Sequence, residues 1–250
     1  MPHILKTEAI CLRSRNWRET SKIVTLLTPG FGLIKGIARG ARRPKNPYAS
    51  ALDLFAHSQL LLYLRENRDL CTIGEAELID AHTGIALDYS RYRTAGEIVN
   101  FLLSVLVHRN PEQRIFQLLK NTLSALAHAS KTPTDYSALK GSFLLKAASF
   151  LGFRPQLQSC VICHNPLDVE GIRELPLREN TSIGFDIPKG GVVCSICSTP
   201  TKIALSLEEI QILKVLLHTA GGQLLDQEIS QVLLKLITDY AQFHLEIKRR

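Results

Sequence analysis

Four of the six cysteines in this 250-residue chain occur as two tight pairs. Each pair is a Cys-x-x-Cys motif, and 30 residues separate the two motifs. Two thiolates at this spacing can hold one metal ion from a single turn. A second pair completes the tetrahedral set that zinc prefers, with Zn–S bonds of about 2.3 Å. The spacing therefore predicts one zinc ion bound by Cys160, Cys163, Cys194 and Cys197.

The cysteine pattern has two other interpretations, a redox dithiol and two unrelated turns. A redox motif needs only one pair and usually opens a helix after a strand, whereas both pairs here lie in a Pro- and Gly-rich stretch. Four thiolates also fill a zinc site and leave no position for water, so we expect a structural ion. Cys11 and Cys71 stand alone in strand-like runs, which is typical of buried, reduced thiols.

A second group of residues that could carry a function is basic and lies near the N-terminus. Residues 1–50 hold ten Lys or Arg against two Glu, whereas the whole chain has a net charge of +7. Trp17, Phe31 and Tyr48 are interleaved with these cations. Cations neutralise phosphates and aromatic faces stack on unpaired bases, so this pattern favours nucleic-acid binding over a merely solvated face. The expected contact residues are Arg13, Arg15, Lys22, Lys35, Arg39, Arg42, Arg43 and Lys45.

Catalytic patterns are absent from the sequence. It contains no G-x-S-x-G motif, no Walker-type phosphate loop and no His-Glu-x-x-His motif, so we expect a protein that is not an enzyme. The apolar runs are too short to span a bilayer, and the first residues do not form a signal peptide. These features predict a cytoplasmic protein without a membrane partner.

The elements that must position the basic residues are short strands. Five apolar-rich runs of strand length, separated by turns, occupy residues 1–80: 7–12, 22–27, 33–38, 57–64 and 70–76. Five short strands in about 80 residues suit the OB-fold, a small barrel that binds nucleic acid. We therefore expect an α+β protein that begins with a five-stranded OB-fold domain.

Helical periodicity dominates the rest of the chain. Apolar stripes predict about five helices, around 98–107, 115–126, 135–151, 206–217 and 229–247. The Pro- and Gly-rich segment with both cysteine pairs interrupts them and shows no helical period. We therefore expect a helical domain from residues 81–154 and 202–250, with a four-cysteine zinc module inserted at 155–201.

Several local patterns resemble the RecO family of bacterial recombination mediators. They are Arg18-Glu19-Thr20-Ser21-Lys22-Ile23-Val24, the run from Lys35 to Arg43, Leu151-Gly152-Phe153-Arg154-Pro155, and Gly190-Gly191-Val192-Val193-Cys194. The resemblance implies binding of single- and double-stranded DNA, annealing of complementary strands, and DNA repair and recombination after DNA damage. It also implies partnership with RecR and with the tail of single-strand-binding protein, indirect action on RecA, and association with the nucleoid.

Three rival functions are compatible with the same residues. A zinc-ribbon protein of transcription or translation could bind RNA through the same barrel. A metal- or thiol-dependent enzyme would need an exchangeable position on the metal. A protein-interaction scaffold would show no salt-sensitive binding of nucleic acid.

Overall fold

The computed structural model describes residues 3–43, 46, 50–64, 70–107, 110–129, 135–167, 183–199, 203–225 and 227–247. It contains two compact units, an N-terminal unit (Met1–Asp135) and a C-terminal unit (Tyr136–Arg250). Lys45 and Tyr48, two residues of the expected nucleic-acid surface, lie outside the described residues. The expected domain limits at 80, 154 and 201 stay a prediction.

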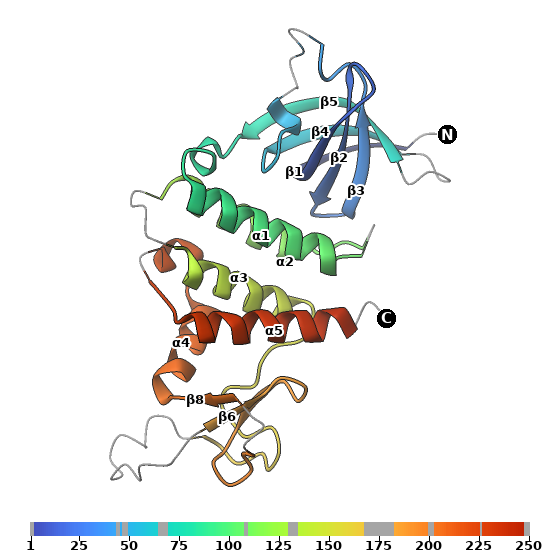
Figure 1. Cartoon of the computed structure of the whole chain (residues 1–250). Helices are drawn as coiled ribbons and strands as arrows, with labels where there is room; N and C mark the ends of the chain where they lie inside the picture. Colours follow the sequence, from blue (N-terminus) through green and yellow to red (C-terminus); the bar gives the residue numbers. More distant parts are fainter. Residues whose placement is uncertain are drawn as a thin grey trace. The chain divides into compact units, whose positions relative to one another are not determined.

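The N-terminal unit begins with a closed barrel of five strands in the order β1-β2-β3-β5-β4 (Figure 1). β3 and β5 pair in parallel, and the other neighbours pair antiparallel. The strands are β1 (His3–Trp17), β2 (Ser21–Thr28), β3 (Gly32–Ala38), β4 (His57–Leu64) and β5 (Leu70–Asp80). This barrel confirms the expected OB-like fold.

The barrel is filled by small and aliphatic side chains from all five strands. Val24, Leu26, Ile34, Leu60 and Leu62 are among its buried residues. Cys11 and Cys71 are buried there and form no disulfide with each other, and burial raises the pKa of Cys11 to about 12. A bulge in β1 between Cys11 and Arg13 breaks the alternation, so Leu12 is buried beside Cys11. Beyond this bulge β1 turns basic side chains outward.

Two helices complete the described part of the N-terminal unit, α1 (Tyr89–Val105) and α2 (Gln113–Ala127). The Asp88 carboxylate caps α1 by accepting from the Arg91 N–H. α2 buries the predicted stripe, which includes Ile115, Leu119, Leu123 and Leu126. Two 3-10 segments, Ser50–Leu52 and Thr83–Ile85, also belong to this unit.

The C-terminal unit packs three helices with a small sheet. The helices are α3 (Ser137–Phe150), α4 (Leu207–His218) and α5 (Gln231–Ile247), and a 3-10 segment spans Gly221–Leu224. β6 (Ile183–Asp186) is the central strand, flanked by β7 (Gly191–Val193) and β8 (Ile203–Leu205). Ser206 and Glu209 form the predicted capping box of α4. Among the described helices of both units, none is long and apolar enough to cross a membrane.

Candidate metal centre and nucleic-acid interface

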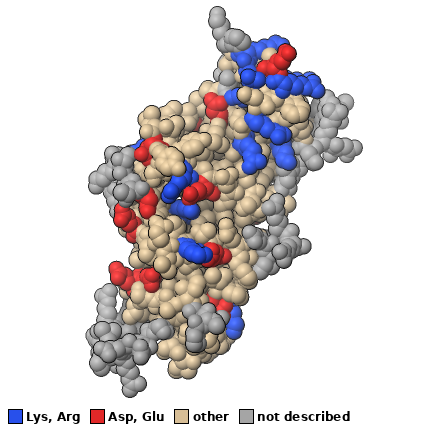
Figure 2. Space-filling model, viewed as in Figure 1, with Lys and Arg blue, Asp and Glu red and all other residues tan. Residues whose placement is uncertain are grey.

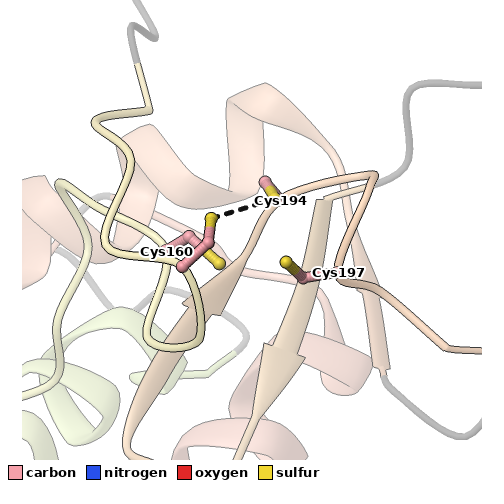
Figure 3. Close-up of side chains that lie close together, drawn as sticks. Cys160, Cys194 and Cys197 are labelled. Atoms are coloured by element: carbon pink, nitrogen blue, oxygen red, sulfur yellow. Dashed lines mark hydrogen bonds between the residues drawn. The ribbon is translucent and has the colours of Figure 1, made fainter.

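The four cysteines predicted to bind metal meet in the C-terminal unit. Their sulfur atoms all lie within 4.8 Å of one another, and Sγ of Cys163 and Cys194 are 3.7 Å apart. Figure 3 shows Cys160, Cys194 and Cys197 pointing toward one another. Four sulfurs around one zinc ion are separated by about 3.8 Å when each bond is about 2.3 Å. This cluster could therefore hold a metal ion with little movement.

The first cysteine pair lies on a tight turn that is closed by hydrogen bonds between main-chain groups. The N–H of Cys160 donates to the carbonyl of Asn165, and the N–H of His164 donates to the carbonyl of Cys160, both at 2.9 Å. His164 has a φ of 63°, the left-handed conformation needed to reverse the chain here. The turn therefore presents Cys160 and Cys163 on one side.

The second cysteine pair follows β7 and is joined to the first through the main chain. Gln156 pairs in parallel with Gly191: its N–H donates to Gly190, and its carbonyl accepts from Val192. A Cβ at Gly191 would lie 2.4 Å from the Gln156 oxygen, so only glycine fits this position. These bonds place the segment leading to Cys160 beside the strand leading to Cys194.

Aromatic contacts anchor the four-cysteine module to α5. The Tyr240 hydroxyl donates to the carbonyl of Phe153 at 3.2 Å, and His244 Nε2 lies 2.7 Å from the carbonyl of Ile187. The rings of Phe153 and His244 stack at 5.2 Å, and Phe185 meets Tyr240 edge-on at 5.7 Å. The last helix therefore supports both the start of the module and its β6–β7 turn.

The electrostatics of the cluster favour a bound cation. Burial raises the pKa of Cys160, but main-chain N–H groups of Cys163, Cys194 and Ile162 outweigh it and lower this pKa to about 6. The neighbouring thiols, Cys194 first, raise the pKa of Cys197. The cluster thus accepts one negative charge easily and resists further ionisation until a cation neutralises it.

The strand register gathers three of the predicted basic residues on the outside of the barrel, and a fourth, Arg39, directly follows β3. Arg13 lies opposite Thr25, which lies opposite Lys35, and in the next outward row Arg15 lies opposite Ile23. Residues opposite each other in an antiparallel pair point to the same side of the sheet. We call the set of exposed residues on this side the cationic face: Arg13, Arg15, Trp17, Lys35 and Arg39.

An open hollow of about 890 Å³ lies at one end of the cationic face. Trp17, Arg18, Arg39 and Arg43 are among its lining residues, and Trp17 is 42% exposed. Figure 2 shows Lys and Arg side chains gathered over the barrel. The hollow therefore combines an accessible aromatic ring with several cations, as a site for unpaired bases requires.

Other predicted residues are placed differently. Lys22 lies in register with Asn16 and the buried Ala38, which puts it on the opposite side of the sheet, and its Nζ pairs with Asp53 at 2.7 Å. The Arg42 guanidinium donates to the carbonyls of Arg18 and Glu19 at 3.2 and 3.1 Å. Both residues thus have structural contacts in addition to any role toward nucleic acid.

Fold and site together define a barrel protein of the OB type that carries helices and a four-cysteine module. Residues 1–82 match the family model "Recombination protein O N terminal", and residues 86–250 match "Recombination protein O C terminal". The chain is 31% identical to the DNA repair protein RecO of Thermoanaerobacter sp. (strain X514), covering 98% of this chain and 94% of that protein. It is also 31% identical to the DNA repair protein RecO of Nocardioides sp. (strain ATCC BAA-499 / JS614), covering 97% and 95%. The chain therefore belongs to the RecO family of DNA repair proteins.

Proposed function

We propose that this chain is a recombination mediator that works without catalysis. It binds single- and double-stranded DNA, anneals complementary strands and, together with RecR, helps to load RecA on strands covered by single-strand-binding protein. It does so at the nucleoid, in gap and break repair. The observation that carries the proposal is the cationic face, where exposed cations and Trp17 share one side of β1, β2 and β3.

The physical argument concerns repulsion between DNA strands. Two complementary strands repel through their phosphates, and a protein that neutralises phosphates on both lowers the free energy of bringing them together. Base pairing then supplies the free energy of annealing, so no catalytic residue is needed. Contacts to phosphate also carry no sequence information, which suits a protein that repairs DNA at any position.

The salt dependence of binding tests the cationic face directly. Each phosphate contact on a single strand contributes about 0.7 to the slope of log K against log salt. The full-length variant Arg15→Gln, Lys35→Gln should therefore bind a single-stranded oligonucleotide more weakly, with a slope shallower by about 1.4. Arg93→Gln, Arg114→Gln removes two exposed helical cations of the same unit and serves as the matched control. An unchanged slope in the first variant, with normal thermal melting, would place the DNA site elsewhere.

RNA binding is the alternative function of the same barrel, because bases of RNA and DNA stack equally well on an aromatic ring. Comparison of DNA and RNA strands of equal sequence separates the two functions. We expect tighter binding of DNA. A clear preference for RNA would contradict the proposal.

We also propose that the ion held by the cysteine cluster is a single structural Zn²⁺. Four thiolates form a soft donor set, and their near-tetrahedral spacing suits zinc. All four positions would be occupied by protein, so the ion would shape the module without binding substrate. This role leaves DNA binding to the cationic side chains.

A further inference from the structure

A second basic site lies in the C-terminal unit, far from the cationic face in sequence. A hollow of about 370 Å³ opens between the segment after α3 and the end of α4. Three of its lining residues are basic, two are amides and none is acidic: Arg154, Pro155, Gln156, Leu157, Gln158, Lys214, Leu217 and His218. The hollow therefore offers many hydrogen-bond donors and no carboxylate.

The basic side chains come from two segments and meet at one point. The Arg154 guanidinium donates to Nε2 of His218 at 3.2 Å. Lys214 lies four residues before His218 on α4, so both project from the same side of the helix. A guanidinium has five N–H donors, and this bond uses one of them. Most of the donors of Arg154 thus remain for a ligand.

The dipole of α4 does not account for this grouping. A helix C-terminus attracts cations within its last turn, where His218 is the basic residue of α4, but Lys214 lies one turn earlier. Arg154 comes from another segment and adds a further cation to the same place. Within the part of the chain that the structure describes, neither Arg154 nor Lys214 forms an ion pair with a carboxylate. Crowding cations without a carboxylate costs free energy, which a bound anion would offset.

The wall of the hollow is held in place before any ligand arrives. The main chain of Gln156 is bonded to Gly190 and Val192 in the four-cysteine module. The Gln156 side-chain oxygen accepts from the Gln158 N–H at 3.0 Å, which leaves the amide nitrogen as a donor. A fixed wall lowers the entropy lost when an anion binds.

We infer that this hollow binds phosphate groups of a DNA backbone and is a second DNA contact, separate from the barrel. The inference rests on the proposed function and names the surface on the C-terminal unit that contributes to it. Phosphate fits better than an acidic peptide because the exposed ends of the lining side chains are cations and amides, which donate to phosphate oxygens, whereas Pro155 and Leu157 are buried and Leu217 is half-buried.

The test uses the full-length chain with Arg154→Gln and Lys214→Gln. Arg154 is exposed and Lys214 is half-buried, and neither belongs to the core. The slope of log K against log salt for a single-stranded oligonucleotide should become shallower by up to about 1.4, and annealing of bare complementary strands should slow. Arg93→Gln, Lys235→Gln removes two cations that are each paired with a carboxylate on their own helix, and it should change neither quantity.

The single variant Lys214→Gln keeps the bond between Arg154 and His218. Its slope should change by about half as much as the slope of the double variant. An unchanged slope in both hollow variants, with DNA binding still sensitive to Arg15→Gln, Lys35→Gln, would overturn the inference and leave the proposed function standing. An equal loss in the control pair would overturn it too, as a general effect of charge. So would a hollow variant that binds DNA normally but no longer binds a poly-glutamate peptide. Failure of the unchanged protein to bind DNA would overturn both proposals.

Discussion

At the scale of single residues, each cysteine of the cluster offers one ligand atom. Among the described His, Cys, Asp and Glu side chains, no fifth one belongs to the cluster, so a lost cysteine has no replacement there. We predict about one zinc ion per chain and none in the Cys194→Ser variant. Structural zinc stabilises finger peptides by roughly 10–16 kcal/mol, so the module should unfold without it. Metal analysis and circular dichroism measure both effects.

The neighbouring Ser195→Ala substitution is the control for Cys194→Ser, because Ser195 is exposed in the same turn. It should leave the zinc content and melting unchanged. The N-terminal unit is compact by itself and should keep its melting transition in both variants. A Cys194→Ser protein that retains zinc or melts normally would contradict the assignment of the ligands.

A second residue-scale feature joins the barrel to α2 inside the N-terminal unit. The Glu8 carboxylate on β1 accepts from His57 on β4 at 2.8 Å and from Lys120 on α2 at 3.3 Å. Burial lowers the pKa of His57, against the effect of Glu8. Burial acts to raise the pKa of Glu8, but the bonds from His57 and Lys120 outweigh it and lower this pKa. Both groups thus bind protons less readily in the folded state than in the unfolded chain.

Acid should therefore destabilise the N-terminal unit in two steps. The unfolded chain takes up a proton at His57 near pH 6.5, before the folded state does, so stability is complete above that pH and falls through the folded pKa. Glu8 adds a second loss below about pH 4.3. His57→Gln should remove the first step and weaken the second, which Lys120 still supports, as measured by melting temperature against pH. His128→Gln, an exposed histidine at the end of α2, should keep both steps.

At the scale of elements, the pairing of Gln156 with β7 should be sensitive to a single methyl group. Gly191→Ala places a Cβ against main-chain oxygen, which cannot move without breaking bonds to Gly190 and Val192. We predict that the free energy of unfolding of the C-terminal unit falls by about 1–3 kcal/mol in denaturant titrations. Gly222→Ala meets no atom within 4 Å and should be nearly neutral.

The strands and helices show how much of the fold could be predicted from the sequence. The five barrel strands and the five helices α1–α5 overlap the predicted runs, because apolar periodicity marks each buried side, whereas the short strands β6, β7 and β8 were not predicted. β1 extends beyond the predicted residues 7–12 because its outer half pairs with β2 while carrying polar, exposed side chains. α1 begins at Tyr89, ahead of the predicted 98–107, because Tyr89 and Tyr92 are exposed and break the apolar stripe.

The sites differ in how far local sequence defines them. Cysteine spacing alone identified the four residues of the cluster, since a metal turn is a local structure. The cationic face depends on which side of a strand each residue occupies, and a bulge beside Arg13 changes that alternation. The hollow with Arg154 and His218 joins residues 64 positions apart, so no local pattern could have predicted it.

At the scale of the whole molecule, the positive charge is divided unequally between the two units. Residues 1–135 hold eighteen Lys or Arg against twelve Asp or Glu, a net +6, whereas residues 136–250 have a net +1. A fragment of residues 1–135 should therefore still bind a single strand. It should anneal bare strands modestly more slowly, because two strands must be shielded at once. It should almost fail to anneal strands coated with single-strand-binding protein, because we expect the helices of the C-terminal unit to supply the grip on that protein.

Strand-annealing rates of the fragment and of the full chain, on bare and on coated DNA, measure this division. The full chain carrying Arg15→Gln, Lys35→Gln is the useful comparison, because it should have a weakened cationic face but keep the C-terminal unit that the fragment lacks. A fragment that anneals coated strands as fast as the full chain would show that the C-terminal unit contributes only structure.

The position of the only tryptophan has a practical consequence. Trp17 is the sole indole of the chain, and it is exposed beside Arg18, Arg39 and Arg43 at the end of the cationic face. Indole emission depends on the polarity around the ring and on contact with a stacked base. This protein therefore contains its own optical reporter at one defined place, so occupancy of the barrel can be followed in real time without a dye, while the C-terminal unit contains no tryptophan.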